Sequence, residues 1–140
     1  MSDVIHSGSC LCGAVRYEVE GRLRPVIGCH CTQCRKQTGH YMAATAAKLT
    51  DFKITRDEGL RWFRSSERAE RAFCQICGST LFWKGTERDY VAIAAGTLDG
   101  VTGLAIAGHI FCADKGDYYD IEGGGFQEPS WHRPQGSSTS

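Results

Sequence analysis

Three cysteines stand close together in the sequence, at Cys29, Cys31 and Cys34. Residues two apart in an extended chain point to the same side, so Cys29 and Cys31 can face one point. The Cys-x-x-Cys turn that follows returns Cys34 to that point. We call these three residues the triplet. Three thiolates are one ligand short of the closed tetrahedron of structural zinc, so either a distant residue completes the site or the fourth position is open to water or substrate.

Two further cysteine pairs flank the triplet in the sequence, Cys10/Cys12 before it and Cys74/Cys77 after it. Together they make a closed four-thiolate zinc site, which we call the four-cysteine cluster. We expect this site to be structural, and metal binding of this kind contributes on the order of 10 kcal/mol to folding. The partition uses seven of the eight cysteines and leaves Cys112 alone.

The triplet itself has three interpretations. It is an open catalytic site, or a second structural zinc whose fourth ligand is His40, His109 or Cys112, or a pair of thiols that form a disulfide. In a reducing cytoplasm such a disulfide would form transiently on oxidation and would not be a permanent structural cross-link. His30 lies between two ligands and is expected to point to the opposite face, away from the metal. Cys112 is expected as a small buried hydrophobic residue of an apolar strand.

Basic and aromatic side chains near the cysteines allow a substrate site as well. Arg35 and Lys36 follow the triplet directly, and they are either an anion-binding rim for substrate carboxylates or an ordinary solvated loop. Four bulky aromatic residues are interpreted as core rather than as a platform for substrate: Trp62, Phe63, Phe82 and Trp83.

The composition restricts the class of protein. The chain has 140 residues, which fits one domain, and its 16 basic and 16 acidic residues cancel. A zero net charge argues against a nucleic-acid binder. The sequence shows neither a transmembrane-length apolar run nor a signal peptide, so we expect a cytoplasmic protein without membrane contact. Thiols are kept reduced there, which favours metal ligation by the cysteines over disulfides.

Short strands must position these cysteines. Val15, Tyr17 and Val19 alternate with charged residues, which is the period of a half-buried strand. Residues 41–47 are compatible with a buried strand or a helical piece, and residues 35–40 with a loop that holds one helical turn. Further short strands are expected at 52–55, 60–64, 81–83, 90–96 and 105–112, and the charged segment 65–71 is either a hairpin connection or one turn of helix. Many short strands without a long amphipathic helix predict a mainly β domain.

Four motifs together resemble a known family. They are Gly8-Ser-Cys-Leu-Cys-Gly-Ala-Val, Cys29-His-Cys-Thr-Gln-Cys-Arg, Arg71-Ala-Phe-Cys-Gln-Ile-Cys-Gly-Ser and Ala95-Gly-Thr-Leu-Asp. Their order and spacing are similar to the glutathione-dependent formaldehyde-activating enzyme (GFA) family, which also includes centromere protein V. The later His109-Ile-Phe is similar to the last strand motif of that family. The resemblance runs from about Gly8 to about Phe126, nearly the whole chain.

The resemblance implies a β-tent fold of small antiparallel sheets around a structural zinc on the four-cysteine cluster. It also implies a second, catalytic zinc on the triplet. The domain expected from it spans residues 1–128, and residues 129–140 form a polar, flexible tail. The tail and Cys112 have no counterpart in the family pattern. The three thiolates of the second site weaken zinc as a Lewis acid, which predicts looser metal binding there.

The implied activity is that of a carbon–sulfur lyase. It joins a small-molecule thiol such as glutathione to formaldehyde or a related small aldehyde, or runs the reverse reaction. Fold alone does not fix function. Two alternatives therefore stay open: a non-catalytic zinc-stabilised binding module, and a thiol redox enzyme that uses the thiols of the triplet directly.

Overall fold

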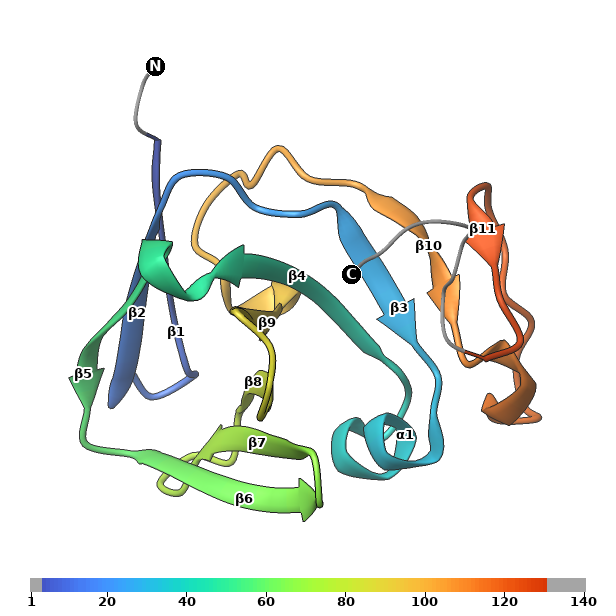
Figure 1. Ribbon diagram of the computed structural model, residues 1–140, viewed down its shortest axis with the longest axis horizontal. Coiled ribbons are helices and arrows are strands. Elements are labelled where there is room, and N and C mark those ends of the chain that lie inside the picture. Colours follow the sequence, from blue (N-terminus) through green and yellow to red (C-terminus); the bar gives the residue numbers. More distant parts are fainter. Residues whose placement is uncertain (1–3, 131–140) are drawn as a thin grey trace.

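The computed structural model of this chain describes residues 4–130. Within this range the chain forms mostly short strands and a single α-helix, α1 (Thr32–Thr38) (Figure 1). Three 3-10 turns accompany them: η1 (Leu49–Asp51), η2 (Ala95–Thr97) and η3 (Cys112–Asp114). The strands are β1 (Ile5–Ser9), β2 (Val15–Glu20), β3 (Val26–Cys29), β4 (Met42–Lys48), β5 (Phe52–Asp57), β6 (Leu60–Ser66), β7 (Ala69–Cys74), β8 (Thr80–Gly85), β9 (Tyr90–Ala94), β10 (Ile106–Ile110) and β11 (Phe126–Gln127).

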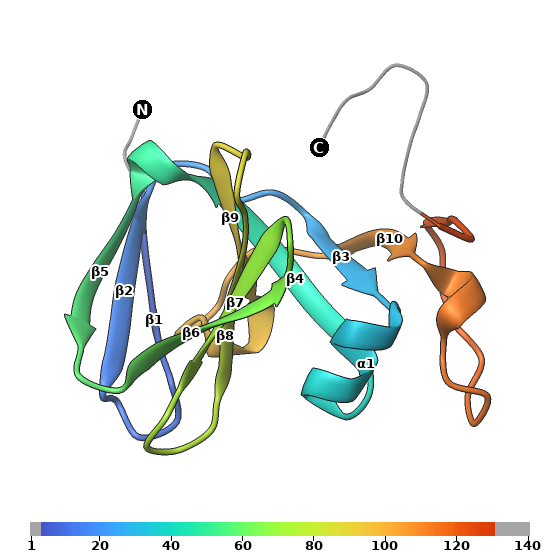
Figure 2. The ribbon, with the colours of Figure 1, turned by 60° about the horizontal axis from the view of Figure 1, so that its bottom comes forward.

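The strands form two sheets. The smaller sheet has the order β1-β2-β5, and the larger one the order β11-β10-β3-β4-β9-β8-β7-β6. In the view of Figure 2 the small sheet stands at one side, and β3, β10 and α1 stand at the other. All pairs are antiparallel except those of β10 with β3 and with β11, which are parallel. The prediction of a mainly β fold is confirmed, although the larger sheet is mixed rather than purely antiparallel.

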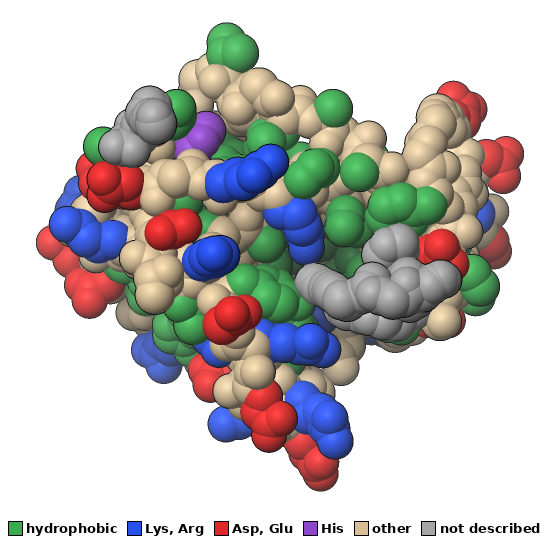
Figure 3. Space-filling model, turned by 45° about the horizontal axis from the view of Figure 1, so that its top comes forward, with side chains coloured by type: hydrophobic (Ala, Val, Ile, Leu, Met, Phe, Trp, Pro, Cys, Tyr) green, Lys and Arg blue, Asp and Glu red, His purple; other side chains and the backbone are tan. Residues whose placement is uncertain are grey.

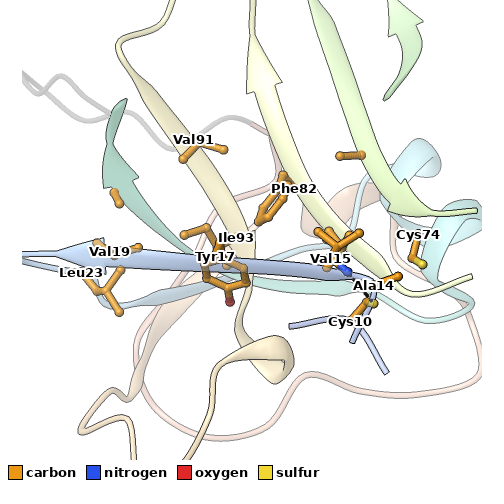
Figure 4. Packing of buried hydrophobic residues seen from close by; sticks show 13 residues of the cluster. Cys10, Ala14, Val15, Tyr17, Val19, Leu23, Cys74, Phe82, Val91 and Ile93 are labelled. Carbon is orange, nitrogen blue, oxygen red and sulfur yellow. Dashed lines mark hydrogen bonds between the residues drawn. The ribbon is translucent and has the colours of Figure 1, made fainter. Parts of the chain in front are cut away.

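The core sits between the sheets. In β2 the buried residues Val15, Tyr17 and Val19 alternate with exposed charges, as their period predicts. They pack against Phe82 and Ile93 of the larger sheet (Figure 4). Cys10 and Cys74 belong to the same buried cluster, so the four-cysteine cluster is continuous with the core.

The central strand of the larger sheet explains an ambiguity in the sequence. Residues 42–48 form β4, which pairs with β3 on one side and with β9 on the other. Four of its residues are alanine, and most of the strand is buried. A strand covered on both faces shows no alternation, which is why periodicity did not separate strand from helix here.

Several local predictions need correction. Residues 32–38 form α1, so the segment predicted as a loop with one turn is helical from Thr32. Strand β10 ends at Ile110, and Cys112 is half-buried in η3 rather than buried in a strand. The side chain of Phe63 is 59% exposed and does not belong to the core. It lies on β6 at the edge of the larger sheet, where nothing in the described part of the chain pairs with its outer side.

The start of the expected tail is tied to the domain. The carbonyl oxygens of Pro129 and Ser130 accept hydrogen bonds from the backbone N–H groups of Ala113 and Phe111. The rest of that prediction, residues 131–140, lies outside the described residues. Within residues 4–130, α1 and the short turns are too short to span a membrane.

Candidate metal centres and active site

The four-cysteine cluster joins two distant segments. Cys10 and Cys12 follow β1, and Cys74 and Cys77 stand at the end of β7 and in the turn after it. Their four sulfur atoms lie within 4.8 Å of one another. The Sγ atom of Cys12 lies 3.7 Å from that of Cys10 and 3.8 Å from that of Cys74. A tetrahedral zinc with Zn–S bonds of about 2.3 Å requires S–S separations of about 3.8 Å, so this arrangement fits the metal.

Backbone and hydroxyl donors surround these sulfurs. The N–H of Val15 donates to Sγ of Cys10 over 3.3 Å, and the N–H of Cys77 donates to Sγ of Cys74 over 3.5 Å. Ser79 holds the two loops together, since its hydroxyl contacts Sγ of Cys77 at 3.2 Å and accepts from the N–H of Leu11 at 2.9 Å. The Ser79 hydroxyl lowers the pKa of Cys77 to about 5. Donors aimed at sulfur favour the thiolate form that a metal needs.

The turn after β7 depends on Gly78. This residue has a φ of 85°, in the left-handed region, and its N–H donates to the carbonyl of Cys74 over 2.7 Å. A side chain at this position would strain the turn. The Cys-x-x-Cys-Gly sequence therefore brings Cys74 and Cys77 to the same side.

The triplet forms where β3 runs into α1. Cys29 ends β3, Cys31 is the N-terminal cap of α1, and Cys34 lies on the first turn of that helix. Their sulfur atoms also lie within 4.8 Å of one another. The N–H of Cys34 donates to Sγ of Cys31 over 3.3 Å, which is a helix cap made by sulfur in place of the usual oxygen.

The three thiols favour one negative charge at Cys31. Hydrogen bonds from the Cys29 and Cys34 thiols, followed by the N–H of Cys34, lower the pKa of Cys31 to about 2. The pKa of Cys29 is raised, first by its contacts with Cys31 and Cys34 and then by burial. The contact with Cys29 lowers the pKa of Cys34, but the contact with Cys31 and burial outweigh it, so that pKa is raised. Without a cation, ionisation of all three thiols at this site is therefore unfavourable.

No other predicted ligand joins the triplet among the described residues. His40, His109 and Cys112 are absent from both cysteine groups. His30 is fully buried on the opposite face of the loop, as its position between two cysteines predicts. Its Nδ1 lies 2.5 Å from the hydroxyl of Tyr119, and its Nε2 lies 2.9 Å from Nδ1 of His109. These contacts of His30 hold the loop between β3 and α1 on the side opposite to the sulfur atoms of the triplet.

The triplet opens onto a large pocket. The pocket has a volume of about 930 Å³ and reaches from α1 to the β6–β7 and β8–β9 connections. Much of its wall is apolar, formed by Ile27, Met42, Ala44, Trp83, Ala92 and Ile110. The wall also carries four arginines, Arg24, Arg68, Arg71 and Arg88, together with one carboxylate, Glu87. On the face drawn in Figure 3, Lys and Arg side chains border apolar surface.

The basic residues of the pocket differ from those singled out in the sequence. Arg35 and Lys36 lie on α1 and do not line the pocket, so their role as an anion rim stays a prediction. Trp83 is half-buried and packs against the buried group around Cys34, and it also lines the pocket, so its interpretation as core rather than substrate platform stays a prediction. The burial of Phe82 and the packing of the half-buried Trp62 against the core do match the prediction.

Sequence reasoning missed the pocket arginines because they come from four separate connections and strands. One signal was available, since Arg71 is a charged residue inside a strand that is otherwise largely apolar. A charge is tolerated in such a place when a specific partner receives it.

The chain is similar to known proteins over most of its described length. The family model described as glutathione-dependent formaldehyde-activating enzyme matches residues 5–114. The chain is 28% identical over 118 residues to a Schizosaccharomyces pombe protein named as an uncharacterized lyase, covering 83% of this chain and 85% of that one. A crystal structure of a Rhodobacter sphaeroides protein superposes with a TM-score of 0.59 at 26% identity, covering 71% of this chain and 97% of the other. The chain therefore belongs to the glutathione-dependent formaldehyde-activating enzyme family.

Proposed function

We propose that this chain is a zinc-dependent carbon–sulfur lyase that joins a thiol such as glutathione to formaldehyde or a related small aldehyde, and runs the reverse reaction. Family membership and the lyase name of the yeast relative support this class of reaction. The observation that carries it is the position of the triplet, whose three sulfurs line a pocket that also holds four arginines.

Zinc is the metal that we propose for both cysteine groups. Cys10, Cys12, Cys74 and Cys77 would hold a structural ion, and Cys29, Cys31 and Cys34 a second ion with a fourth position facing the pocket. A zinc ion in the triplet would lower the pKa of an incoming thiol and polarise the aldehyde oxygen. The proposal requires a reducing compartment such as the cytoplasm, where cysteines remain available as ligands.

The pocket suits an acidic thiol. Glutathione carries two carboxylates and one ammonium group, and arginine is the side chain best shaped to bind carboxylates through paired N–H donors. Arg68 and Arg88 lie near the β6–β7 and β8–β9 turns, and Arg24 precedes β3. We infer that these arginines hold the carboxylates while the thiol reaches the triplet.

The apolar wall has a separate role. Met42, Ala44 and Ala92 form a buried group with Cys34, and Trp83 packs against them. An apolar surface beside the sulfurs excludes water, and electrostatic interactions are stronger where water is excluded. The pocket therefore orients the thiol and shields the aldehyde carbon at the same place.

The reaction balances without an oxidant or a reductant. The thiol adds across the C=O bond, so that one S–C bond forms, the C=O π bond opens, and the proton of the thiol ends on the oxygen. The reverse reaction returns that proton to sulfur and releases the aldehyde.

The test is the rate of exchange between formaldehyde, glutathione and their hydroxymethyl adduct at equilibrium, followed by NMR. The zinc-loaded chain should accelerate exchange above the uncatalysed rate, and Cys31→Ser should remove the acceleration. Cys112→Ser is a matched control, because this cysteine lies outside both groups and should leave the rate unchanged. Exchange at the wild-type rate in Cys31→Ser would refute the proposal.

One observation supports the alternative function as a thiol redox enzyme. The thiolate favoured at Cys31 lies within 4.8 Å of two other sulfurs, which is a suitable arrangement for disulfide formation after oxidation. Peroxide treatment followed by mass spectrometry tests this function. A disulfide inside the triplet that forms and is reduced during turnover would favour a redox enzyme over the lyase.

A further inference from the structure

Arg71 occupies an unusual place for a charged side chain. It lies on β7 inside the wall of the pocket and is only 5% exposed. Its neighbour Ala72 is fully buried, and Cys34 stands opposite on α1. A buried guanidinium is costly unless an opposite charge or a full set of hydrogen bonds compensates it.

The guanidinium faces one side of α1. Nη1 donates to Sγ of Cys34 over 3.4 Å and to Oε1 of Gln37 over 3.1 Å, and Nη2 donates to Oε1 of Gln33 over 3.3 Å. The Nε atom is buried without a hydrogen-bond partner among the described residues. Arg71 therefore holds Cys34 through a sulfur contact and through two glutamines of the same helix.

Arg71 forms no direct ion pair with a carboxylate in the described part of the chain. The ion pairs found there are Arg56 with Glu58 and Arg64 with Glu70, both on exposed side chains. The partners of Arg71 are two neutral amides and a sulfur. Of these, only the sulfur becomes negative, when Cys34 is a thiolate.

We propose that Arg71 is the counter-charge of the triplet and a positioning residue for its metal. Three thiolates and one divalent cation carry a net charge of minus one, and the guanidinium brings the buried group to neutrality. Through Cys34, Arg71 also fixes the position of the sulfur donated by α1. The inference rests on the proposed function for the metal in the triplet, and it assigns a role to a residue that is not a ligand.

The experiment measures zinc affinity without any substrate, by competition with a chelator at fixed pH on fully reduced protein. Arg71→Met should weaken the affinity of the triplet roughly 10- to 100-fold, the range for loss of a residue that supports a metal ligand. Arg71→Lys keeps the positive charge and should retain most of the zinc affinity of the triplet. The four-cysteine cluster is an internal control and should keep its zinc. Arg64→Met, an exposed change on the neighbouring strand, should leave both affinities unchanged.

A second variant covers the outcome in which Arg71→Met does not fold. Gln33→Glu places a carboxylate against Nη2 of Arg71 on the exposed side of α1, so the guanidinium gains another counter-charge. It should weaken zinc binding at the triplet, whereas Gln127→Glu, with the same change of charge on exposed β11, should not.

Three results would overturn the inference. They are wild-type affinity in both Arg71→Met and Gln33→Glu, equal loss at both zinc sites, and an equal loss of affinity in Arg71→Lys and Arg71→Met. Because no thiol or aldehyde is present, failure here is distinct from failure of the lyase proposal. An Arg71→Met chain with weak zinc binding is expected to recover exchange activity when excess zinc is supplied, which separates metal retention from catalysis.

Discussion

The sulfur atoms of Cys12 and Cys74 lie 3.8 Å apart although 62 residues separate them in the sequence. This contact joins the loop after β1 to the end of β7, and with it the smaller sheet to the larger one. Cys74 is fully buried and belongs to the core cluster that contains Val15 and Leu81. Through the buried Cys10 and Cys74 the four-cysteine cluster is therefore continuous with the core, whereas Cys12 is exposed.

Removing one ligand from this cluster should unfold the chain. We expect Cys74→Ser to lose the zinc proposed for this cluster, because a site with three sulfurs and a buried hydroxyl forfeits much of a binding free energy on the order of 10 kcal/mol. Circular dichroism melts and zinc content per chain measure this. Cys29→Ser removes a ligand from the triplet and should still fold. A folded Cys74→Ser chain with unchanged zinc would contradict the structural role.

Arg68 should contribute to binding of the thiol but little to the chemical step. It is exposed on the turn between β6 and β7 and lines the pocket. We expect Arg68→Ala to raise KM for glutathione about two- to five-fold with kcat nearly unchanged, the size of an exposed ion pair. The control is Arg64→Ala, which changes an exposed arginine of β6 outside the pocket wall. The same rise in KM in both variants would mean that the net charge of the protein, and not a contact with Arg68, affects binding of glutathione.

Tyr17 should set the alkaline limit of stability. Burial raises its pKa to about 12, from an ordinary value near 10, while its hydroxyl bonds Oγ1 of Thr97 at 2.7 Å. As the pH rises past about 10, the unfolded chain releases this proton while the folded chain retains it. Stability therefore falls between about pH 10 and pH 12, by on the order of 2–3 kcal/mol.

Tyr17→Phe provides the measurement for this effect. At pH 8 the variant should be less stable by about 1 kcal/mol, because one hydrogen bond is lost. Its stability should not show the loss due to Tyr17 above pH 10, so the difference between the two proteins should shrink and then reverse. Denaturant titrations at several pH values follow this difference. Parallel curves over pH 8–12 would show that Tyr17 does not titrate in this way.

Gly28 should be intolerant of a methyl group. A Cβ built on this residue would lie 2.5 Å from Nδ1 of His109 and 3.0 Å from the ring of Tyr41. We expect Gly28→Ala to cost about 1–3 kcal/mol through overpacking and to shift the His109–His30 contact behind the triplet. Gly96→Ala is the control, since its Cβ would meet nothing within 4 Å. Thermal melts compare the two, and an equal small change in both would show that β3 and β10 adjust freely.

The sequence by itself predicted the two cysteine groups and the class of fold. Cysteines two residues apart in an extended segment, or three apart in a turn, can face one side, so their spacing indicated the groups before the fold was known. The alternation of Val15, Tyr17 and Val19 predicted β2 for the same reason. The family followed from motif order and spacing, which are properties of the sequence alone.

The tertiary structure decided which residues share the pocket and which side chains pair. Arg24, Arg68, Arg71 and Arg88 meet only because β3, β7, β8 and β9 lie in one sheet, and that order is not encoded by any local period. The contact of Arg71 with Cys34 likewise spans 37 residues and depends on how α1 packs against β7. Local spacing brings Cys29, Cys31 and Cys34 together, whereas long-range strand pairing brings Cys10 and Cys12 to Cys74 and Cys77, since pairing depends on burial summed over the whole chain.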